Sequence, residues 1–422
     1  MIKKYFPFII LLLLHVAGFV YVSQTLNIYL KDSLEYLKLA KNLVANFTIY
    51  SGDLNGPILP QLVSLRPPGY GAFIAFAKIF STNNLAIVLM QGLVSLMSIA
   101  LLLKTINKLF KTNYSYFIAV AFLFFPSQIV YTNMIMSEIF FQFLILLFVY
   151  LHMLYFTKGK SKHLVLASIC LCFMLLTKPV SLFILICYSL FVIIQISLKQ
   201  MSLSTLMYPI IGIICLLSYQ YYNYEKTEYF HYSSITSTYL LNYQLLPTLN
   251  YHSGIFAENP PQQKIDTINE LAEKETTFKD YSKKRISLTV AEIKKTPGTF
   301  LWLTTLGVFN FFFDPGKWDV YEFIIDKHEA YNGALLIFLW IVLFFKLVVF
   351  SLFVYSLTLI KKQSPIFLLI LFIVLSVALA TGITGSARFH LPVYPLVLIL
   401  CVLSLQHPNF RLFTDNFKQH SD

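Results

Sequence analysis

Long apolar runs, separated by short polar or basic segments, repeat along almost the whole 422-residue chain. A helix that crosses a bilayer needs roughly 20 mostly apolar residues. The predicted spans are residues 5–24, 84–103, 115–131, 138–157, 163–177, 180–198, 204–222, 331–360, 365–383 and 390–406. The pattern predicts an all-α polytopic membrane protein with about ten transmembrane helices. The number rises to twelve if two short apolar stretches, 69–80 and 299–313, also span.

Clusters of Lys and Arg between the spans predict the orientation, because cytoplasmic loops carry an excess of these residues. The clusters are Lys3 and Lys4; Lys104, Lys108 and Lys111; Lys158, Lys160 and Lys162; Lys199; Lys361 and Lys362; and Arg411 and Lys418. With ten spans, every cluster lies on the same side. We therefore expect both termini in the cytoplasm, with the first apolar run kept as a signal anchor because it lacks a small-x-small cleavage site.

This topology predicts three parts of the chain. Residues 1–222 form an N-terminal membrane module whose first outer loop is 25–68, residues 223–298 form a second outer segment, and residues 299–422 form a C-terminal membrane module. Apolar residues alternate with Lys and Glu over 278–295, which predicts a helix that lies on the membrane or closes over a cavity. Lys346 interrupts the run 331–360, which we keep as one helix in which this lysine snorkels or faces a polar interior.

Composition supports a membrane protein and excludes other classes. Only 12% of the residues are charged, whereas an ordinary soluble domain has about 25%. The net charge of +12 is distributed among short loops, not along one face of a soluble domain, so we expect no nucleic-acid partner. The five cysteines all lie within apolar runs and predict neither a disulfide framework nor a metal site.

Two acidic residues stand at predicted outer ends of spans. Asp32 follows the first span, and helical spacing places it on one face with Tyr36, Ala40 and Leu43. It suits a base that deprotonates an acceptor, or simply a carboxylate favoured by a helix N-terminus. Glu138 opens the fourth span, where an acid is tolerated if it faces a wet cavity.

Basic residues also occur on the predicted outer side, where they are disfavoured. The segment 65–71 turns the chain back toward the bilayer through two prolines and a glycine and holds Arg66 at headgroup depth. Lys178 ends the fifth span, and Arg388 and His390 precede the last one. These residues either snorkel individually or line one anion-binding cavity, where a guanidinium binds phosphate oxygens in a forked geometry.

The order of these motifs resembles the GT-C superfamily of glycosyltransferases, which includes protein O-mannosyltransferases and the bacterial aminoarabinose transferase of lipid A. The matching residues are Asp32, Tyr36 and Ala40; Arg66 to Tyr70; Glu138; Thr177 to Pro179; and Arg388 to Pro392. The segment 306–321, with Asp314-Pro315-Gly316, looks like bacterial members that depend on a lipid carrier. Ser33 follows Asp32, whereas the mannosyltransferases have an Asp-Glu pair, which weighs against mannose or protein as substrates.

The resemblance implies transfer of a sugar from a polyprenyl-phosphate carrier to an acceptor on the outer face of a bacterial plasma (inner) membrane, by inverting displacement. It implies Asp32 and Glu138 as catalytic residues and Arg66, Lys178 and Arg388 as ligands of the donor phosphate. Tyr36, Tyr70 and His390 would support them. Membrane lipids are further partners, and the acceptor is a glycan, a lipid or a protein. A divalent metal is compatible with this chemistry, but no cluster has metal-ligand spacing, so no cofactor is required.

Two other classes of protein fit the same pattern. A transporter or flippase of a lipid-linked saccharide also needs cations that face headgroup phosphates, although it has no need of Asp32. A polymerase or ligase of surface polysaccharide has similar spans and a large outer loop, and it uses a diphosphate-linked donor.

Overall fold

The structure is a computed structural model that describes residues 2–253, 261–324, 333–360 and 365–406. All regular secondary structure in these ranges is helical. The α-helices are α1 Ile2–Thr25, α2 Ser33–Asn46, α3 Pro60–Val63, α4 Pro68–Phe80, α5 Leu85–Phe110, α6 Ser115–Leu123, α7 Pro126–Asn133, α8 Glu138–Lys158, α9 Lys162–Leu175, α10 Ser181–Ser197, α11 Met207–Thr227, α12 Ile235–Tyr239, α13 Leu246–Ser253, α14 Pro261–Glu273, α15 Phe278–Ile293, α16 Pro297–Phe313, α17 Lys317–Phe323, α18 Gly333–Leu359, α19 Pro365–Thr381, α20 Ala387–His390 and α21 Tyr394–Leu405.

The helices confirm an all-α polytopic membrane protein. Seven helical segments in the described part of the chain are long and apolar enough to cross a bilayer. Three more apolar helices, α9, α10 and α16, have only 14, 17 and 17 residues. Each predicted span coincides with a helix or a pair of helices, while the total of ten crossings stays a prediction.

The predicted span 115–131 is not one continuous helix. It consists of α6 and α7, which meet at an angle of 71°. The break lies just before Pro126, which has no amide hydrogen to donate and disfavours helical geometry in the residue before it. As a result, α7 does not continue the direction of α6, and its Gln128 hydrogen-bonds to Gln142 near the start of α8.

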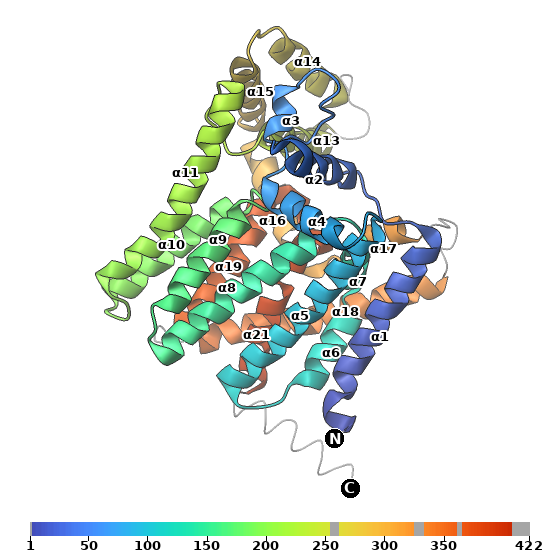
Figure 1. Ribbon diagram of the computed structural model, residues 1–422, viewed down its shortest axis with the longest axis vertical. Helices are drawn as coiled ribbons and strands as arrows, with labels where there is room; N and C mark the ends of the chain where they lie inside the picture. The colour runs from blue at the N-terminus through green and yellow to red at the C-terminus, as the bar shows by residue number, and fades with distance from the viewer. Residues whose placement is uncertain (1, 254–260, 325–332, 361–364, 407–422) are drawn as a thin grey trace.

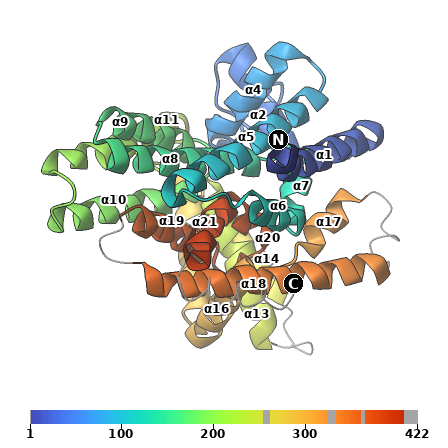
Figure 2. The same ribbon diagram turned by 90° about the horizontal axis from the view of Figure 1, so that it is seen from below.

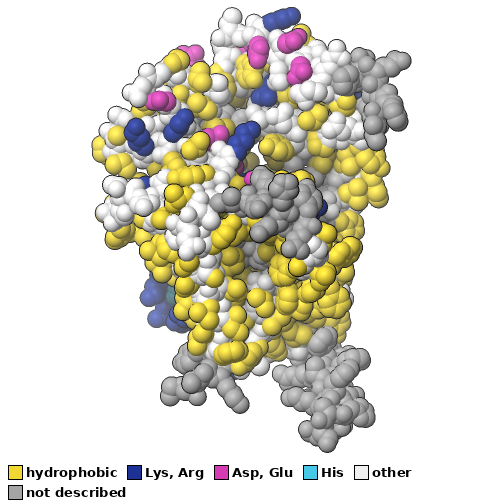
Figure 3. Space-filling model, turned by 90° about the vertical axis from the view of Figure 1, so that its right-hand side faces the viewer, with side chains coloured by type: hydrophobic (Ala, Val, Ile, Leu, Met, Phe, Trp, Pro, Cys, Tyr) yellow, Lys and Arg dark blue, Asp and Glu magenta, His cyan; other side chains and the backbone are white. Residues whose placement is uncertain are grey.

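The helices form two regions. A bundle contains the long apolar helices, and a lobe at one end contains α2, α3 and α12–α15 (Figures 1 and 2). We call this second region the polar lobe. Apolar side chains cover much of the bundle surface, and acidic side chains gather toward the lobe (Figure 3). On α18, for example, Ile337, Trp340 and Phe344 are all more than 60% exposed, as expected for side chains that face lipid.

Two predictions about individual helices can be compared with the structure. Residues 278–293 form α15 as predicted, and the buried Arg285 donates a hydrogen bond to Thr238 beneath it. Residues 333–359 form the single helix α18, in which Lys346 is buried. Its ammonium group donates to the carbonyl of Asp314 and lies 4.8 Å from the ring centre of Phe125. Lys346 therefore faces the interior of the protein. The predicted basic clusters at 361–362 and 411–418 lie outside the described residues.

The orientation can be tested with single cysteines in a background whose native cysteines are replaced. We expect an impermeant maleimide added to intact cells to label a cysteine at Asn250, in the polar lobe, but not one at Lys158, at the opposite end of α8. The reason is that Lys158 belongs to a lysine cluster, which is retained in the cytoplasm. Labelling of both sites after permeabilisation is the control. If only the cysteine at Lys158 were labelled in intact cells, the protein would have the opposite orientation to the predicted one.

Candidate active site

Six charged side chains meet where the bundle joins the polar lobe, and they form an unbroken chain of ion pairs in which acids and bases alternate. In order along the chain of contacts they are Glu35, Arg66, Asp32, Arg388, Glu138 and Lys178. Three carboxylates thus face three cations. The structure brings together all five residues that the sequence suggested for catalysis and phosphate binding.

The first half of this chain is centred on Arg66. Its Nε lies 2.7 Å from Oε2 of Glu35, and its NH2 nitrogen lies 2.9 Å from Oδ1 of Asp32. The guanidinium also lies 5.2 Å from the ring centre of Tyr36. One guanidinium therefore joins two acids of the same helical segment and holds them beside the turn at 65–68.

The second half is centred on Glu138, whose side chain is completely buried. One of its oxygens, Oε1, accepts from Nε of Arg388 at 2.6 Å and lies 3.0 Å from Nζ of Lys178. The other, Oε2, is buried and has no hydrogen-bond partner among the described residues. Arg388 also donates to Oδ2 of Asp32 at 3.0 Å, so this arginine connects the two halves.

The environment keeps Asp32 ionised. Partial burial by itself raises the pKa of this carboxyl, but the positive charges of Arg66 and Arg388 outweigh burial and hold its pKa below the usual value. The pairing stabilises the folded state above the unfolded-state pKa of an aspartate, and this contribution is lost as the pH falls through the lower folded-state value. At neutral pH Asp32 is therefore a carboxylate that can accept a proton.

Backbone contacts explain how motifs far apart in the sequence reach one place. The amide of Gly69 donates to the carbonyl of Leu176 at 2.5 Å, which brings the turn that carries Arg66 against the turn that carries Lys178. A Cβ atom at Gly69 would lie only 2.7 Å from that carbonyl oxygen and 2.6 Å from the hydroxyl of Thr177. Only glycine allows this approach.

Two further contacts position the remaining acids and Arg388. The hydroxyl of Ser33 donates to the carbonyl of Ile135 at 2.9 Å, which fixes the start of α2 beside the start of α8. One turn into α8, the side-chain Nε2 of Gln142 donates to the backbone carbonyl of Leu391 at 2.8 Å. This contact holds the segment after Arg388 against the helix that begins with Glu138.

Comparison with known proteins identifies the family that this arrangement resembles. The sequence model of the family described as dolichyl-phosphate-mannose-protein mannosyltransferase matches residues 65–220. This range contains Arg66, Glu138 and Lys178. The match confirms the resemblance to GT-C membrane glycosyltransferases. Asp32 and Arg388 lie outside the matched range.

No curated protein sequence matches the chain. The crystal structure of ArnT from Cupriavidus metallidurans in the apo state is similar over 92% of this chain and 76% of that chain, with 13% identity and a TM-score of 0.38.

The three supporting residues have different surroundings. Tyr36 and Tyr70 are buried and pack edge to face, and the ring of Tyr36 lies beneath the guanidinium of Arg66. Their hydroxyls bond to Ser137 and Gln91. His390 is buried among aromatic rings, and neither of its ring nitrogens has a hydrogen-bond partner in the described part of the chain. The tyrosines form the floor of the site, whereas His390 contributes to packing behind Arg388.

The sequence analysis did not assign Glu35 and Asp319 to the site. Glu35 lies three residues after Asp32 in a helix, and this spacing indicates that both acids reach the same cation. Asp319 is nearly buried and accepts hydrogen bonds from the hydroxyls of Ser127 and Tyr131. The sequence contains no signal for this contact, because it joins residues 188 or more positions apart.

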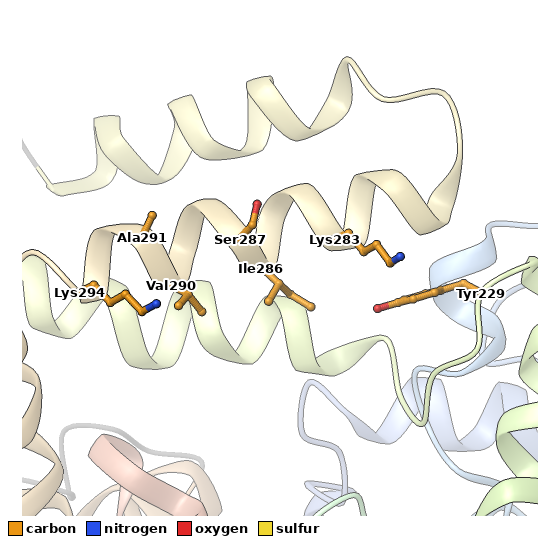
Figure 4. A pocket seen from close by; sticks show the side chains of 7 residues that line it. All are labelled: Tyr229, Lys283, Ile286, Ser287, Val290, Ala291 and Lys294. Atoms are coloured by element: carbon orange, nitrogen blue, oxygen red, sulfur yellow. The ribbon is translucent and has the colours of Figure 1, made fainter.

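A separate groove of about 490 Å³ lies in the polar lobe, against α15. Lys283 and Lys294 stand at its two ends, with Ile286 and Val290 between them (Figure 4). It shares no residue with the ion-pair chain. Among the residues described, no group of three or more His, Cys, Asp or Glu side chains is arranged to hold a metal ion.

The close contact at Gly69 yields a prediction about assembly. Gly69→Ala forces a methyl group against backbone and should destabilise the protein by about 1–3 kcal/mol, as overpacking does. It should also lower activity, because the turns of Arg66 and Lys178 must separate. Thermal unfolding in detergent measures the first effect. Gly298→Ala is the matched control, since a Cβ atom there meets nothing within 4 Å. Equal stability of the two variants would contradict the prediction.

Proposed function

We propose that the protein transfers a sugar from a polyprenyl-phosphate carrier to an acceptor at the outer face of the plasma membrane. The family match supports a membrane glycosyltransferase. The observation that carries the proposal is the alternating chain of ion pairs, which contains three cations at the end of the bundle where a lipid phosphate would lie.

The cations suit a lipid-phosphate leaving group. During transfer, the bond between the anomeric carbon and the phosphate oxygen breaks, and its electron pair stays on the phosphate. Arg66, Lys178 and Arg388 stabilise the negative charge that develops there. In the structure carboxylates occupy these cations, so a phosphate that binds must displace at least one carboxylate from its cation.

This displacement makes a carboxylate available as a base when the donor phosphate is bound. Each oxygen of Asp32 is paired with one arginine. A phosphate that replaces Asp32 as the ion-pair partner of Arg66 and Arg388 frees the carboxylate. The carboxylate then accepts the proton of the acceptor hydroxyl or amine. The acceptor atom attacks the anomeric carbon from the face opposite the phosphate, which inverts its configuration. Asp32 is 22% exposed, so an acceptor reaches it more easily than it reaches the buried Glu138.

Glu138 has a different role in this scheme. It is the only described carboxylate that pairs with Lys178, and it shares Arg388 with Asp32. Its complete burial favours a role in which it fixes these two cations in place. Its unpartnered Oε2 is available to orient the acceptor if binding opens the site.

Asp32→Asn tests the proposed base. The substitution keeps the shape of the side chain and removes its charge, and it should lower the transfer rate by ~10²–10⁴. The variant should still fold, because Arg66 remains ion-paired with Glu35 and Arg388 remains ion-paired with Glu138. The assay uses purified protein with the lipid-linked sugar that accumulates when the protein is absent from cells.

Asp53→Asn is the matched control, because Asp53 belongs to the same loop, where its carboxylate accepts a hydrogen bond from the backbone amide of the neighbouring Asn55. It should retain the wild-type rate. Wild-type transfer by Asp32→Asn would disprove the base and make Glu138 the leading candidate. Transport of the lipid-linked sugar without transfer, unaffected by Asp32→Asn, would support a flippase instead.

Glu138→Gln should differ from Asp32→Asn in its effect on stability. It leaves Lys178 without its carboxylate in a buried position, and breaking a buried ion pair typically costs about 3–5 kcal/mol. We expect a clearly lower unfolding temperature in detergent for Glu138→Gln and a small change for Asp32→Asn. Similar unfolding temperatures would show that Glu138 does not serve as the anchor of the cations.

A further inference from the structure

The turn at Asp314-Pro315-Gly316 lies beside the segment that carries Arg388. Oδ1 of Asp314 accepts a hydrogen bond from the amide of Gly316, and Oδ2 accepts one from the amide of Ala387, both at 2.9 Å. The first bond closes the turn on itself. The second attaches the turn to the residue immediately before Arg388, so a single carboxylate fixes the backbone from which the guanidinium extends.

Gly316 permits this arrangement. Its φ of +79° lies in the left-handed region, which favours glycine. A Cβ atom at this position would lie 2.8 Å from the hydroxyl oxygen of Ser127 and 3.6 Å from the Cβ of Ala387. The turn therefore sits directly between α7 and the start of α20, where a larger residue would push the two apart.

Asp319, one turn later on α17, reaches Arg388 through an intermediate side chain. Its two carboxylate oxygens accept hydrogen bonds from the hydroxyls of Ser127 at 2.7 Å and Tyr131 at 2.8 Å. The guanidinium of Arg388 lies 5.8 Å from the ring centre of Tyr131. Tyr131 thus contacts Arg388 with its ring and Asp319 with its hydroxyl.

We propose that Asp314 and Asp319 are positioning residues that hold Arg388 in place to bind the phosphate of the lipid-linked donor. Asp314 fixes the backbone before Arg388, and Asp319 fixes the ring against which the guanidinium packs. Neither residue belongs to the ion-pair chain itself. The role rests on the proposed function, and it deepens that function by explaining how one of its cations keeps its position.

The charge of Asp319 makes the proposal sharply testable. Burial raises the pKa of its carboxyl to about 6, against the opposing effect of the two hydroxyl hydrogen bonds. At pH 8 it is therefore a buried anion near Arg388. Replacing it by Asn removes a negative charge, which by electrostatics alone would strengthen the binding of a phosphate. Positioning predicts the opposite result.

The experiment titrates a polyprenyl monophosphate into the purified full-length protein in detergent at pH 8. Asp319→Asn should weaken binding about tenfold, the size expected for losing hydrogen bonds to a charged group. Tyr131→Phe keeps the ring beneath Arg388 and should weaken binding in the same direction. It serves as the second variant if Asp319→Asn fails to fold. Asp266→Asn, an exposed aspartate on α14, should have no effect.

A double-mutant cycle with Arg388→Ala separates positioning from general damage. If Asp319 acts through Arg388, Asp319→Asn should cause no further loss in the Arg388→Ala background. Additive losses, or unchanged or tighter binding in Asp319→Asn, would overturn the positioning role. If the wild-type protein neither binds the lipid phosphate nor responds to Arg388→Ala, the proposed function fails as well, and the two failures are thereby distinguished.

Discussion

The burial of charge beside an apolar bundle is the constraint on which the site depends. A charged group removed from water is costly unless an opposite charge and hydrogen bonds replace its hydration. The chain of ion pairs meets this requirement by alternation, since every internal member contacts two partners of the opposite sign. Arg388 is the member that joins its two halves. Without it, the pair of acids near Arg66 and the buried Glu138 would be electrostatically separate.

The same requirement shapes the backbone around the site. Cations and carboxylates pair only when their turns approach within a few ångströms, and three features permit this. Gly69 brings one turn against another, Pro126 redirects α7 toward the start of α8, and Asp314 attaches its own turn to the residue before Arg388. Glycine, proline and a short acidic side chain are used here for their geometry. The geometry of the ion-pair chain therefore depends on residues that are uncharged or that are not themselves members of the chain.

An ion-pair chain with no net charge also suits the proposed function, in which the site binds an anionic phosphate and then releases it. A phosphate competes with carboxylates that already occupy the cations, so binding is balanced against the loss of existing pairs. The exchange leaves a carboxylate free whenever a phosphate is bound. Under the proposed function, the pairing that offsets the cost of burying charge would also link donor binding to the availability of a base.

The sequence by itself determined the membrane class, the positions of the long helices and five of the six charged residues of the ion-pair chain. These follow from apolar periodicity and from charge on the side where charge is disfavoured. Only the tertiary structure decided which charges pair, because Asp32 and Arg388 are 356 positions apart and their contact depends on how helices pack. The bend between α6 and α7 and the buried contact of Asp319 with Tyr131 also depend on packing. Both features are set by residues that are close in space but distant in the sequence, and local sequence patterns do not encode such contacts.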